Sequence, residues 1–548
     1  MERGFQTHTI RKTRELGGLW KLSVPGQSAR QVCVPGCWEN CPGLENYRGS
    51  AEYEKEFEGG GNLHFLFKGV SHTARVFLDG RQIAYHYNAF TPFEAVVPDA
   101  SDGTHLLKIQ VDNSFNEESA LHIPNDYFTY GGINRPVILE EVGDAFLERL
   151  HFKPFRKDGI WHGAVKVRLR SFVPGMPVKV RLLLDGAEFA LLEGTAESET
   201  VILQDTFPFP GVQAYEPDAP KLYSLTAILL QDGKAADDLT DRIGFREISI
   251  RGNRIFFNDS PLLIKGFNRH EDHGLFGCAI PYEAMDYDLR LFEDLGANAV
   301  RTCHYPNDER FLDLCDERGI LVWEEGHARG LSEEQMRHKN FRRQSLDCLE
   351  EMIDNHYNHP CIFIWGILNE CASFTEYGRE VYREQFDFIR KRDDSRPLTF
   401  ASCHFQSDIC LDLPDIVSMN IYPLWYHNSP ADEYLSQVYQ WVQTTEGAGK
   451  PFLISEIGAG AIPGWHAPGN PKWSEERQAE ILQKQLKAVL SHEETSGVFI
   501  WQFCDCRVPD DGFYGRPRCM NNKGIVDEYR RKKLAYHTIR EIFTGGKQ

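Results

Sequence analysis

Long apolar runs are absent from this 548-residue sequence, and no stretch approaches the roughly 20 residues that a membrane-spanning helix needs. The first residues also lack the apolar core of a signal peptide. A hydrophobic content of 41% is ordinary for a soluble globular chain. We therefore expect a cytoplasmic protein that has no membrane partner.

Positive charge is in the minority. The sequence has 60 lysines and arginines against 80 aspartates and glutamates, which gives a formal net charge of -20. Such a chain repels a phosphate backbone, and no clear run of lysine and arginine offers a local basic face. Nucleic acid is therefore not expected as a partner.

A paired cysteine framework is also absent. The fourteen cysteines are scattered over predicted strands, helices and loops, a distribution that favours free thiols over disulfides. Cys33, Cys37 and Cys41 recur every fourth residue, but zinc sites usually combine C-x-x-C with a second ligand cluster. We expect free thiols here and no metal site.

The first 247 residues predict two all-β domains in a chain long enough for about three or four folding units. Residues 1–142 alternate apolar and polar positions in short runs, and Asp79-Gly80 predicts a hairpin turn. We expect a jelly-roll-like β-sandwich there. Residues 143–247 repeat the all-β pattern over the length of an immunoglobulin-like β-sandwich, about 100 residues.

Residues 248–548 alternate short apolar strands with helical periods, which predicts parallel β/α units. Eight such strands close a TIM (β/α)8 barrel, so the expected fold class is a multidomain α+β protein with a C-terminal barrel. The predicted strands are 261–268, 299–303, 320–325, 361–370, 398–403, 415–422, 451–458 and 496–505. The predicted helices are 282–295, 308–318, 341–356, 376–392, 431–444, 475–492 and 534–543.

Two glutamates stand at the polar ends of apolar strands. Glu370 ends the fourth predicted strand, and Glu456 lies at the end of the seventh. A buried carboxylate is costly unless it is paired or hydrogen-bonded, and active sites of TIM barrels lie at the carboxyl ends of the strands. Glycosidases need such a pair, one as proton donor and one as nucleophile or base. Either glutamate alone could be a salt-bridged residue of the barrel rim.

Two neighbours strengthen this interpretation. Asn369 precedes Glu370 and offers an amide to a sugar hydroxyl. Trp501 ends the eighth predicted strand and offers a flat apolar surface to a pyranose ring, although by itself such a tryptophan is more often a core residue.

Long segments of the chain resemble glycoside hydrolase family 2, and within it the β-glucuronidases. The resemblance covers nearly the whole chain and is far more specific than a short motif. The segments that carry it are Gly18-Leu-Trp20, Val34-Pro-Gly36, Asn88-Ala-Phe-Thr-Pro-Phe93, Gly266-Phe-Asn-Arg-His-Glu-Asp272 and Arg301-Thr-Cys-His-Tyr-Pro306.

The resemblance implies roles for the two glutamates. Asn369-Glu370 resembles the acid/base motif of the family, and Ser455-Glu-Ile-Gly458 resembles its nucleophile motif, in an enzyme that retains anomeric configuration. This chemistry requires no metal and no organic cofactor. The chain departs from the family at Cys371, where proline is common, which alters the turn after the acid more than the chemistry.

The resemblance also implies a uronic acid substrate. β-Glucuronidases bind the sugar carboxylate with an Asn-x-Lys motif, and Asn521-Asn522-Lys523 resembles it. A lysine supplies a point charge for a carboxylate, although such a segment alone is more often a polar turn. Further positions that match sugar contacts of the family are Asp126, His304, Asn420, Tyr422 and Tyr426. Asp126 would reach in from the first sandwich, or simply cap a turn.

A basic segment distinguishes this chain from well-known β-glucuronidases. Only a short connection separates Glu325 from the helix at Phe341, and it contains Arg337-His-Lys339. A charged helix start in water is one interpretation. The other is that Arg337 reaches the carboxylate or the C4 hydroxyl of the sugar, which leaves both C4 epimers, glucuronide and galacturonide, open.

The sequence thus predicts a retaining exo-β-hexuronidase that acts on a small or oligosaccharide uronoside. A β-galactosidase or β-mannosidase of the same family is the nearest alternative. A catalytically inactive carbohydrate-binding protein is another, but it would be expected to have lost one of the two glutamates. Because members of the family are often oligomers, a homo-oligomer is also an expectation.

Overall fold

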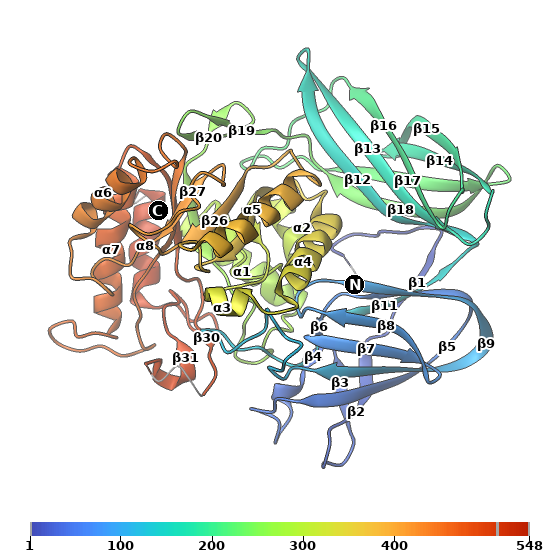
Figure 1. Ribbon diagram of the computed structural model, residues 1–548, viewed down its shortest axis with the longest axis horizontal. Helices are drawn as coiled ribbons and strands as arrows, with labels where there is room; N and C mark the ends of the chain where they lie inside the picture. Colours follow the sequence, from blue (N-terminus) through green and yellow to red (C-terminus); the bar gives the residue numbers. More distant parts are fainter. Residues whose placement is uncertain (1–2, 511–514, 546–548) are drawn as a thin grey trace.

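The computed structural model describes residues 3–510 and 515–545. Two β-sandwiches lie on one flank of the molecule and a barrel of strands and helices lies on the other (Figure 1). None of the helices in these residues is long and apolar enough to cross a membrane. All fourteen cysteines are free, as the scattered spacing predicts.

The N-terminal sandwich contains an eight-stranded antiparallel sheet and a three-stranded sheet, β4-β10-β6. Buried aromatic side chains, among them Trp20, Trp38 and Phe65, fill its core. The predicted hairpin turn is confirmed between β7 and β8, where Asp79 and Gly80 both have positive φ, as a type I′ turn requires. Its strands are β1 (Lys12–Glu15), β2 (Gly18–Ser23), β3 (Arg30–Val34), β4 (Gly36–Cys37), β5 (Ser50–Phe67), β6 (Val70–Ser71), β7 (Thr73–Leu78), β8 (Arg81–Tyr87), β9 (Phe93–Asp112), β10 (Gly132–Ile133) and β11 (Val137–Val142).

The second sandwich consists of a three-stranded sheet, β12-β13-β16, and a four-stranded sheet, β15-β14-β17-β18. Alternate residues of both sheets, such as Val165, Val180 and Leu225, are buried in one common core. Its strands are β12 (Ala145–Lys157), β13 (Ile160–Ser171), β14 (Pro177–Leu184), β15 (Ala187–Thr195), β16 (Thr200–Phe209), β17 (Tyr223–Gln231) and β18 (Lys234–Ile243).

The C-terminal part of the described chain forms a closed parallel barrel in the order β22-β23-β24-β25-β26-β27-β28-β29. The strands are β22 (Ile264–Asn268), β23 (Ala299–Arg301), β24 (Leu321–Glu325), β25 (Ile362–Asn369), β26 (Leu398–Ser402), β27 (Val417–Asn420), β28 (Phe452–Ile457) and β29 (Thr495–Ile500). Each lies within a strand predicted from the sequence, except that β29 begins one residue earlier. The predicted fold class is confirmed.

Helices cover the outside of the barrel. They are α1 (Tyr282–Leu295), α2 (Glu309–Arg318), α3 (Glu333–Met336), α4 (Phe341–His356), α5 (Glu376–Arg390), α6 (Ala431–Val442), α7 (Glu475–Ser491) and α8 (Leu534–Thr544). Short strands flank the barrel: β19 (Ile248–Arg251), β20 (Arg254–Phe257), β21 (Ser260–Pro261), β30 (Cys506–Arg507) and β31 (Met520–Asn521). The four-residue helix α3 has no counterpart in the sequence prediction, because one turn is too short to show a helical period.

The first sandwich docks on the mouth of the barrel. Arg135 donates to the carboxylate of Glu271 at 2.7 Å, and both side chains are buried. Between β9 and β10 the chain crosses to the barrel, where the Tyr127 hydroxyl lies 3.1 Å from His327 Nε2. This connection also contains Asp126, so a residue of the sandwich lies at the end of the barrel where the parallel strands terminate.

Candidate active site

Polar side chains at the carboxyl ends of five barrel strands meet in one hydrogen-bonded network. Arg301 ends β23, Glu325 ends β24, Asn369 ends β25, Asn420 ends β27, and Glu456 lies one residue before the end of β28. All five are buried. Because the strands of the barrel are parallel, their carboxyl ends share one edge. Most of the residues that precede these ends in β25 and β28 are apolar and buried.

Glu370 follows β25 directly and turns toward the mouth. Its backbone has a φ of 51°, in the left-handed region that a non-glycine residue rarely adopts. Its amide donates to the carbonyl of Ala401 at 2.9 Å, and its Oε1 accepts from Asn420 Nδ2 at 2.9 Å. Arg329 lies with its guanidinium 3.4 Å from Oε2. The carboxylate is thus held by an amide on one side and a cation on the other.

Glu456 has two donors of its own. Arg301 Nη1 donates to its Oε1 at 3.0 Å, and the Tyr422 hydroxyl donates to its Oε2 at 2.5 Å. Burial and the nearby charge of Glu370 raise the pKa of Glu456 to about 7, while Arg301 and the Tyr422 hydroxyl oppose this rise. Both donors bind the ionised form, which is the form that a nucleophile needs.

Arg301 links the carboxylates of the network. Its guanidinium donates to both oxygens of Glu325 at 2.8 and 2.9 Å and to Asn369 Oδ1 at 2.8 Å. His304 Nδ1 lies 2.9 Å from Glu325, and burial, with the charge of Arg301, holds the pKa of His304 well below its ordinary value. These surroundings favour the neutral form of His304. Asn369 Nδ2 has no partner among the described residues, so one buried amide donor is available to a sugar hydroxyl.

The predicted Asn-x-Lys segment lies beside the residue predicted from the first sandwich. Asn521 Nδ2 donates to the Asp126 carboxylate at 3.1 Å. Arg516 binds the same carboxylate with two nitrogens, one of them at 2.9 Å. Asp126 therefore does not point a free carboxylate at a sugar. It anchors Asn521 and Arg516 across the boundary between sandwich and barrel.

Lys523 is a buried cation without a carboxylate partner in the described chain, with 2% of its surface exposed. Its ammonium lies 5.2 Å from the ring centre of Tyr426 and 5.7 Å from that of Tyr422. Burial and the positive charge of Arg516 lower its pKa. Although burial acts the other way, Lys523 and Arg516 hold the pKa of Tyr426 below its ordinary value. An anion that binds here would relieve this excess of positive charge.

Trp501 is less available than its sequence position suggests. Its ring stacks on His304 with centroids 5.0 Å apart and planes 17° apart, and it packs edge-on against His270. Only 5% of its surface is exposed. Trp501 therefore supports His304, and its contact with a sugar ring stays a prediction.

Arg337 lies outside this cluster, contrary to the prediction. It caps α3 at its C-terminal end, pairs with Glu333 one turn earlier at 2.8 Å, and covers the ring of Tyr377. Its side chain is 55% exposed. The geometry fits the plainer interpretation of a charged helix end in water.

Three arginines of the cluster were not predicted as site residues. Arg301 stands at the end of a buried strand, as Glu370 and Glu456 do, and this position is the signal that could have identified it. Arg329 and Arg516 belong to irregular segments after β24 and β29. No periodic pattern marks such positions, because their contacts come from distant parts of the chain.

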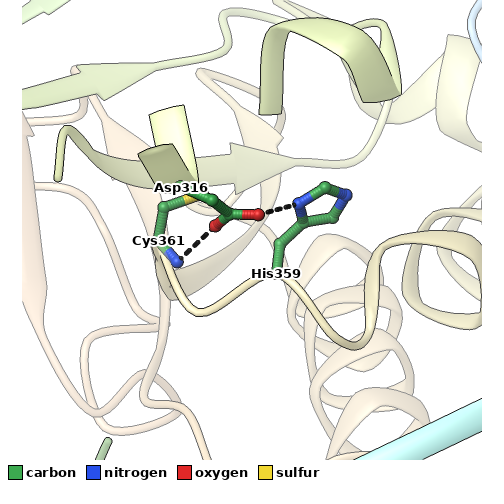
Figure 2. Close-up of side chains that lie close together, drawn as sticks. All are labelled: Asp316, His359 and Cys361. Carbon is green, nitrogen blue, oxygen red and sulfur yellow. Dashed lines mark hydrogen bonds and ion pairs between the residues drawn. The ribbon is translucent and has the colours of Figure 1, made fainter. Parts of the chain in front are cut away.

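One group of possible metal ligands lies elsewhere. Asp316, His359 and Cys361 are buried together, and Figure 2 shows the Asp316 carboxylate between the His359 ring and the Cys361 backbone amide. One carboxylate oxygen lies 2.5 Å from His359 Nδ1, the other accepts from the amide at 2.9 Å, and His359 Nε2 lies 3.4 Å from Arg3. Burial also raises the pKa of the Cys361 thiol well above its usual range. These groups are engaged with one another and with a cation, so they do not fit a metal ion.

Comparison with known proteins identifies the family. Residues 248–546 match the model described as glycosyl hydrolases family 2, TIM barrel domain. The chain belongs to glycosyl hydrolase family 2. A β-galacturonidase of this family from Eisenbergiella tayi, solved with bound galacturonate, is 54% identical, with a TM-score of 0.98 over 100% of this chain and 99% of its own.

Two further relatives are more distant. A β-glucuronidase of Paenibacillus borealis is 27% identical over 97% of this chain and 96% of its own length. A β-glucuronidase of known structure from an uncultured Clostridium is 26% identical in sequence to this chain. The two structures match over 100% of each chain with a TM-score of 0.86. The resemblance inferred from the sequence motifs is thereby confirmed.

Glu370→Gln is expected to move the acid limb of the pH profile of kcat/KM to lower pH. The charge of Glu370 raises the pKa of Glu456, so its removal lowers that pKa, and Glu456 stays ionised in more acidic solution. The measurement needs a dinitrophenyl glycoside, whose leaving group departs without a proton donor. Glu380→Gln, which removes an exposed carboxylate on α5, is the control. An unmoved limb would show that the two carboxylates are not coupled.

Proposed function

We propose that the protein is a retaining exo-acting β-galacturonidase, which removes terminal β-D-galacturonic acid from its glycosides. The observation that carries the choice of a uronide is Lys523, a buried ammonium with Tyr426 and Arg516 beside it and no carboxylate partner in the described residues. A sugar carboxylate would supply that partner. A neutral hexose would leave the cation unpaired, at a cost of a few kcal/mol.

The first chemical step would use both glutamates. Glu456, oriented by Arg301 and Tyr422, attacks the anomeric carbon and forms a glycosyl-enzyme ester. Glu370 donates a proton to the departing glycosidic oxygen. Asn369 Nδ2 supplies a hydrogen bond to a ring hydroxyl as positive charge develops on the sugar.

The second step would reverse the role of Glu370. As a carboxylate it removes a proton from water, the water attacks the anomeric carbon, and Glu456 leaves with its carboxylate restored. Two inversions give net retention. We expect the two carboxyl groups to lie about 5 to 5.5 Å apart with a sugar bound, as retaining glycosidases require.

The choice of the C4 epimer is supported by the relative that is 54% identical, which is described as a β-galacturonidase bound to galacturonate. The β-glucuronidases at 26 and 27% identity favour the epimeric substrate as the second candidate. We propose Arg329 as a candidate for a residue that takes part in this choice. It lies 3.4 Å from Glu370 and 3.3 Å from Asn125 Oδ1, beside Asp126.

Rates on 4-nitrophenyl β-D-galacturonide, β-D-glucuronide and β-D-galactoside test this proposal. We expect kcat/KM on the galacturonide to exceed that on the glucuronide by about 10-fold or more, because a site that hydrogen-bonds one epimer rejects the other. The galactoside lacks the carboxylate and should be slower still. If kcat/KM is highest on the glucuronide, the enzyme is a β-glucuronidase. If kcat/KM is highest on the galactoside, the enzyme is a β-galactosidase.

Arg329→Ala and Arg337→Ala should distinguish the roles of the two arginines that follow β24. We expect Arg329→Ala to reduce kcat/KM on the galacturonide by about 100-fold, since a half-buried cation beside the Glu370 carboxylate is lost. Arg337→Ala removes an exposed helical ion pair, which contributes about 0.3 to 0.5 kcal/mol, so its kinetics should match the wild type. Equal losses in both variants would contradict this assignment.

We also propose a cytoplasmic location and a homo-oligomer. Fourteen free cysteines suit a reducing compartment. Cell fractionation and light scattering with size-exclusion chromatography would test the two proposals.

A further inference from the structure

A second buried lysine lies behind the Asn521–Lys523 segment. Lys533 precedes α8, and its side chain is 1% exposed. Its ammonium donates to the Asp505 carboxylate at 2.7 Å, to the carbonyl of Ala461 at 2.9 Å and to the carbonyl of Asn522 at 3.3 Å. One cation thus joins three separate segments, of which the one with Ala461 is the most distant in the sequence.

Two of these segments lead to residues of the candidate site. Ala461 belongs to the loop that follows Glu456, and its amide donates to the Asn522 carbonyl at 2.9 Å. Asn522 stands between Asn521 and Lys523. The carbonyls that Lys533 binds therefore come from the segment that carries the nucleophile and from the segment that carries the buried ammonium.

Asp505 binds both Lys533 and the turn that follows Lys523. Its Oδ1 accepts from the Gly524 amide at 2.9 Å as well as from Lys533. Gly524 packs so closely on Cys504 and Asp505 that a Cβ at this position would lie 2.2 Å from the Asp505 backbone nitrogen. The turn after Lys523 is therefore tightly packed at a position that requires glycine, and the Asp505 carboxylate also binds it.

A buried ion pair is a poor source of stability, because the cost of removing two charges from water offsets much of their attraction. Burial raises the pKa of Asp505 to about 7 against the opposing charge of Lys533, which reflects this cost. An apolar pair of similar volume could fill the space but would leave the Ala461 and Asn522 carbonyls and the Gly524 amide without these partners. The charged pair of Lys533 and Asp505 therefore contributes directional hydrogen bonds to the backbone.

We propose that Lys533 and Asp505 are positioning residues that hold the Asn521–Lys523 turn against the loop after Glu456 and so determine how tightly the site binds the carboxylate of its substrate. This inference rests on the proposed function. The pair touches neither sugar nor reacting atoms. Its effect is to fix the distance between the carboxylate-binding ammonium and the nucleophile.

The double variant Lys533→Met with Asp505→Asn tests this inference, since it removes both charges and leaves no unpaired ion in the core. The side-chain carbonyl of the introduced asparagine could still accept from the Gly524 amide. We expect KM for the galacturonide to rise about 10-fold or more, because small misplacements of a binding group cost this much, while kcat changes less than about 3-fold. The rate on the neutral galactoside should stay unchanged.

The matched control is Arg396→Met with Asp393→Asn. This pair is also buried and hydrogen-bonded, with Arg396 Nε on the carbonyl of Ile362 at the start of β25, the opposite end of the barrel. It should lose stability in thermal unfolding and keep the wild-type ratio of galacturonide to galactoside. Active enzyme is counted in every variant by covalent trapping with a 2-deoxy-2-fluoro glycoside.

The wild-type and variant measurements answer separate questions. If the wild type prefers the galactoside, the proposed function fails, and the inference fails with it. If the wild type prefers the galacturonide but the Lys533/Asp505 variant loses activity on both substrates equally, or keeps the wild-type KM, the pair has only a structural role. Only a selective rise in KM for the galacturonide supports the inference.

Discussion

Glu456→Gln is expected to reduce turnover of 4-nitrophenyl galacturonide by at least ~10⁴-fold. The amide cannot form the glycosyl-enzyme ester, and removal of a nucleophile in other enzymes costs losses of this order. The fold should survive, because glutamine has the same shape: its one carbonyl oxygen can accept from Arg301, and its amide nitrogen can donate to the Tyr422 hydroxyl oxygen. Steady-state rates with wild-type and variant enzyme measure the loss.

A control variant and a mass-spectrometric measurement complete the test of Glu456. Glu380→Gln changes an exposed glutamate of α5 and should retain wild-type turnover. Mass spectrometry after incubation with a 2-deoxy-2-fluoro galacturonide should show a covalent adduct on Glu456 in the wild type and none in Glu456→Gln. Near-normal turnover in the variant, or an adduct on Glu370 instead, would refute the double-displacement mechanism proposed here.

The barrel could be predicted from the sequence because its strands are continuous apolar runs. Strands such as β25 (Ile362–Asn369) and β28 (Phe452–Ile457) are buried on both sides, so their apolar residues follow one another without interruption. The polar residues that end them stand out against this background. For the same reason the sequence alone indicates Glu370 and Glu456 as candidates.

The cationic part of the site could not be predicted in this way. Arg516 becomes a site residue because the β9–β10 connection of the first sandwich brings Asp126 to the barrel mouth, and Asn125 of the same connection also binds Arg329. Contacts between residues several hundred positions apart leave no local pattern. The sequence favours Arg337 instead because it stands in a basic run, but local charge density does not show which way a side chain points.

Asp126 is a further residue whose contacts could not be predicted from the sequence. A resemblance to the family suggests a direct sugar contact, but the structure engages both carboxylate oxygens with Arg516 and one of them with Asn521. Asp126 does lie beside the Asn521–Lys523 segment, as the resemblance implies. Its partner was not predictable, because Arg516 lies in an irregular segment of the barrel domain.

Lys523→Met is expected to reduce kcat/KM on the galacturonide by about 30- to 4,000-fold. The substrate carboxylate would then be buried without its charge partner, which costs about 2 to 5 kcal/mol, or one factor of ten for each 1.4 kcal/mol. Methionine has a similar length, so packing against Tyr422 and Tyr426 should persist. Lys339→Met, an exposed lysine paired with Glu118, is the control and should keep wild-type kinetics.

The same substitution should make the free enzyme more stable. Burial and Arg516 lower the pKa of Lys523, so the folded protein disfavours the ammonium that the unfolded chain carries at neutral pH. This penalty is present below the pKa of the unfolded lysine, and an apolar side chain removes it. Free galacturonate should raise the midpoint of thermal unfolding of the wild type and have much less effect on Lys523→Met. A variant that is less stable, or that galacturonate stabilises as well as it does the wild type, would show that this lysine supports the fold rather than recognises the substrate.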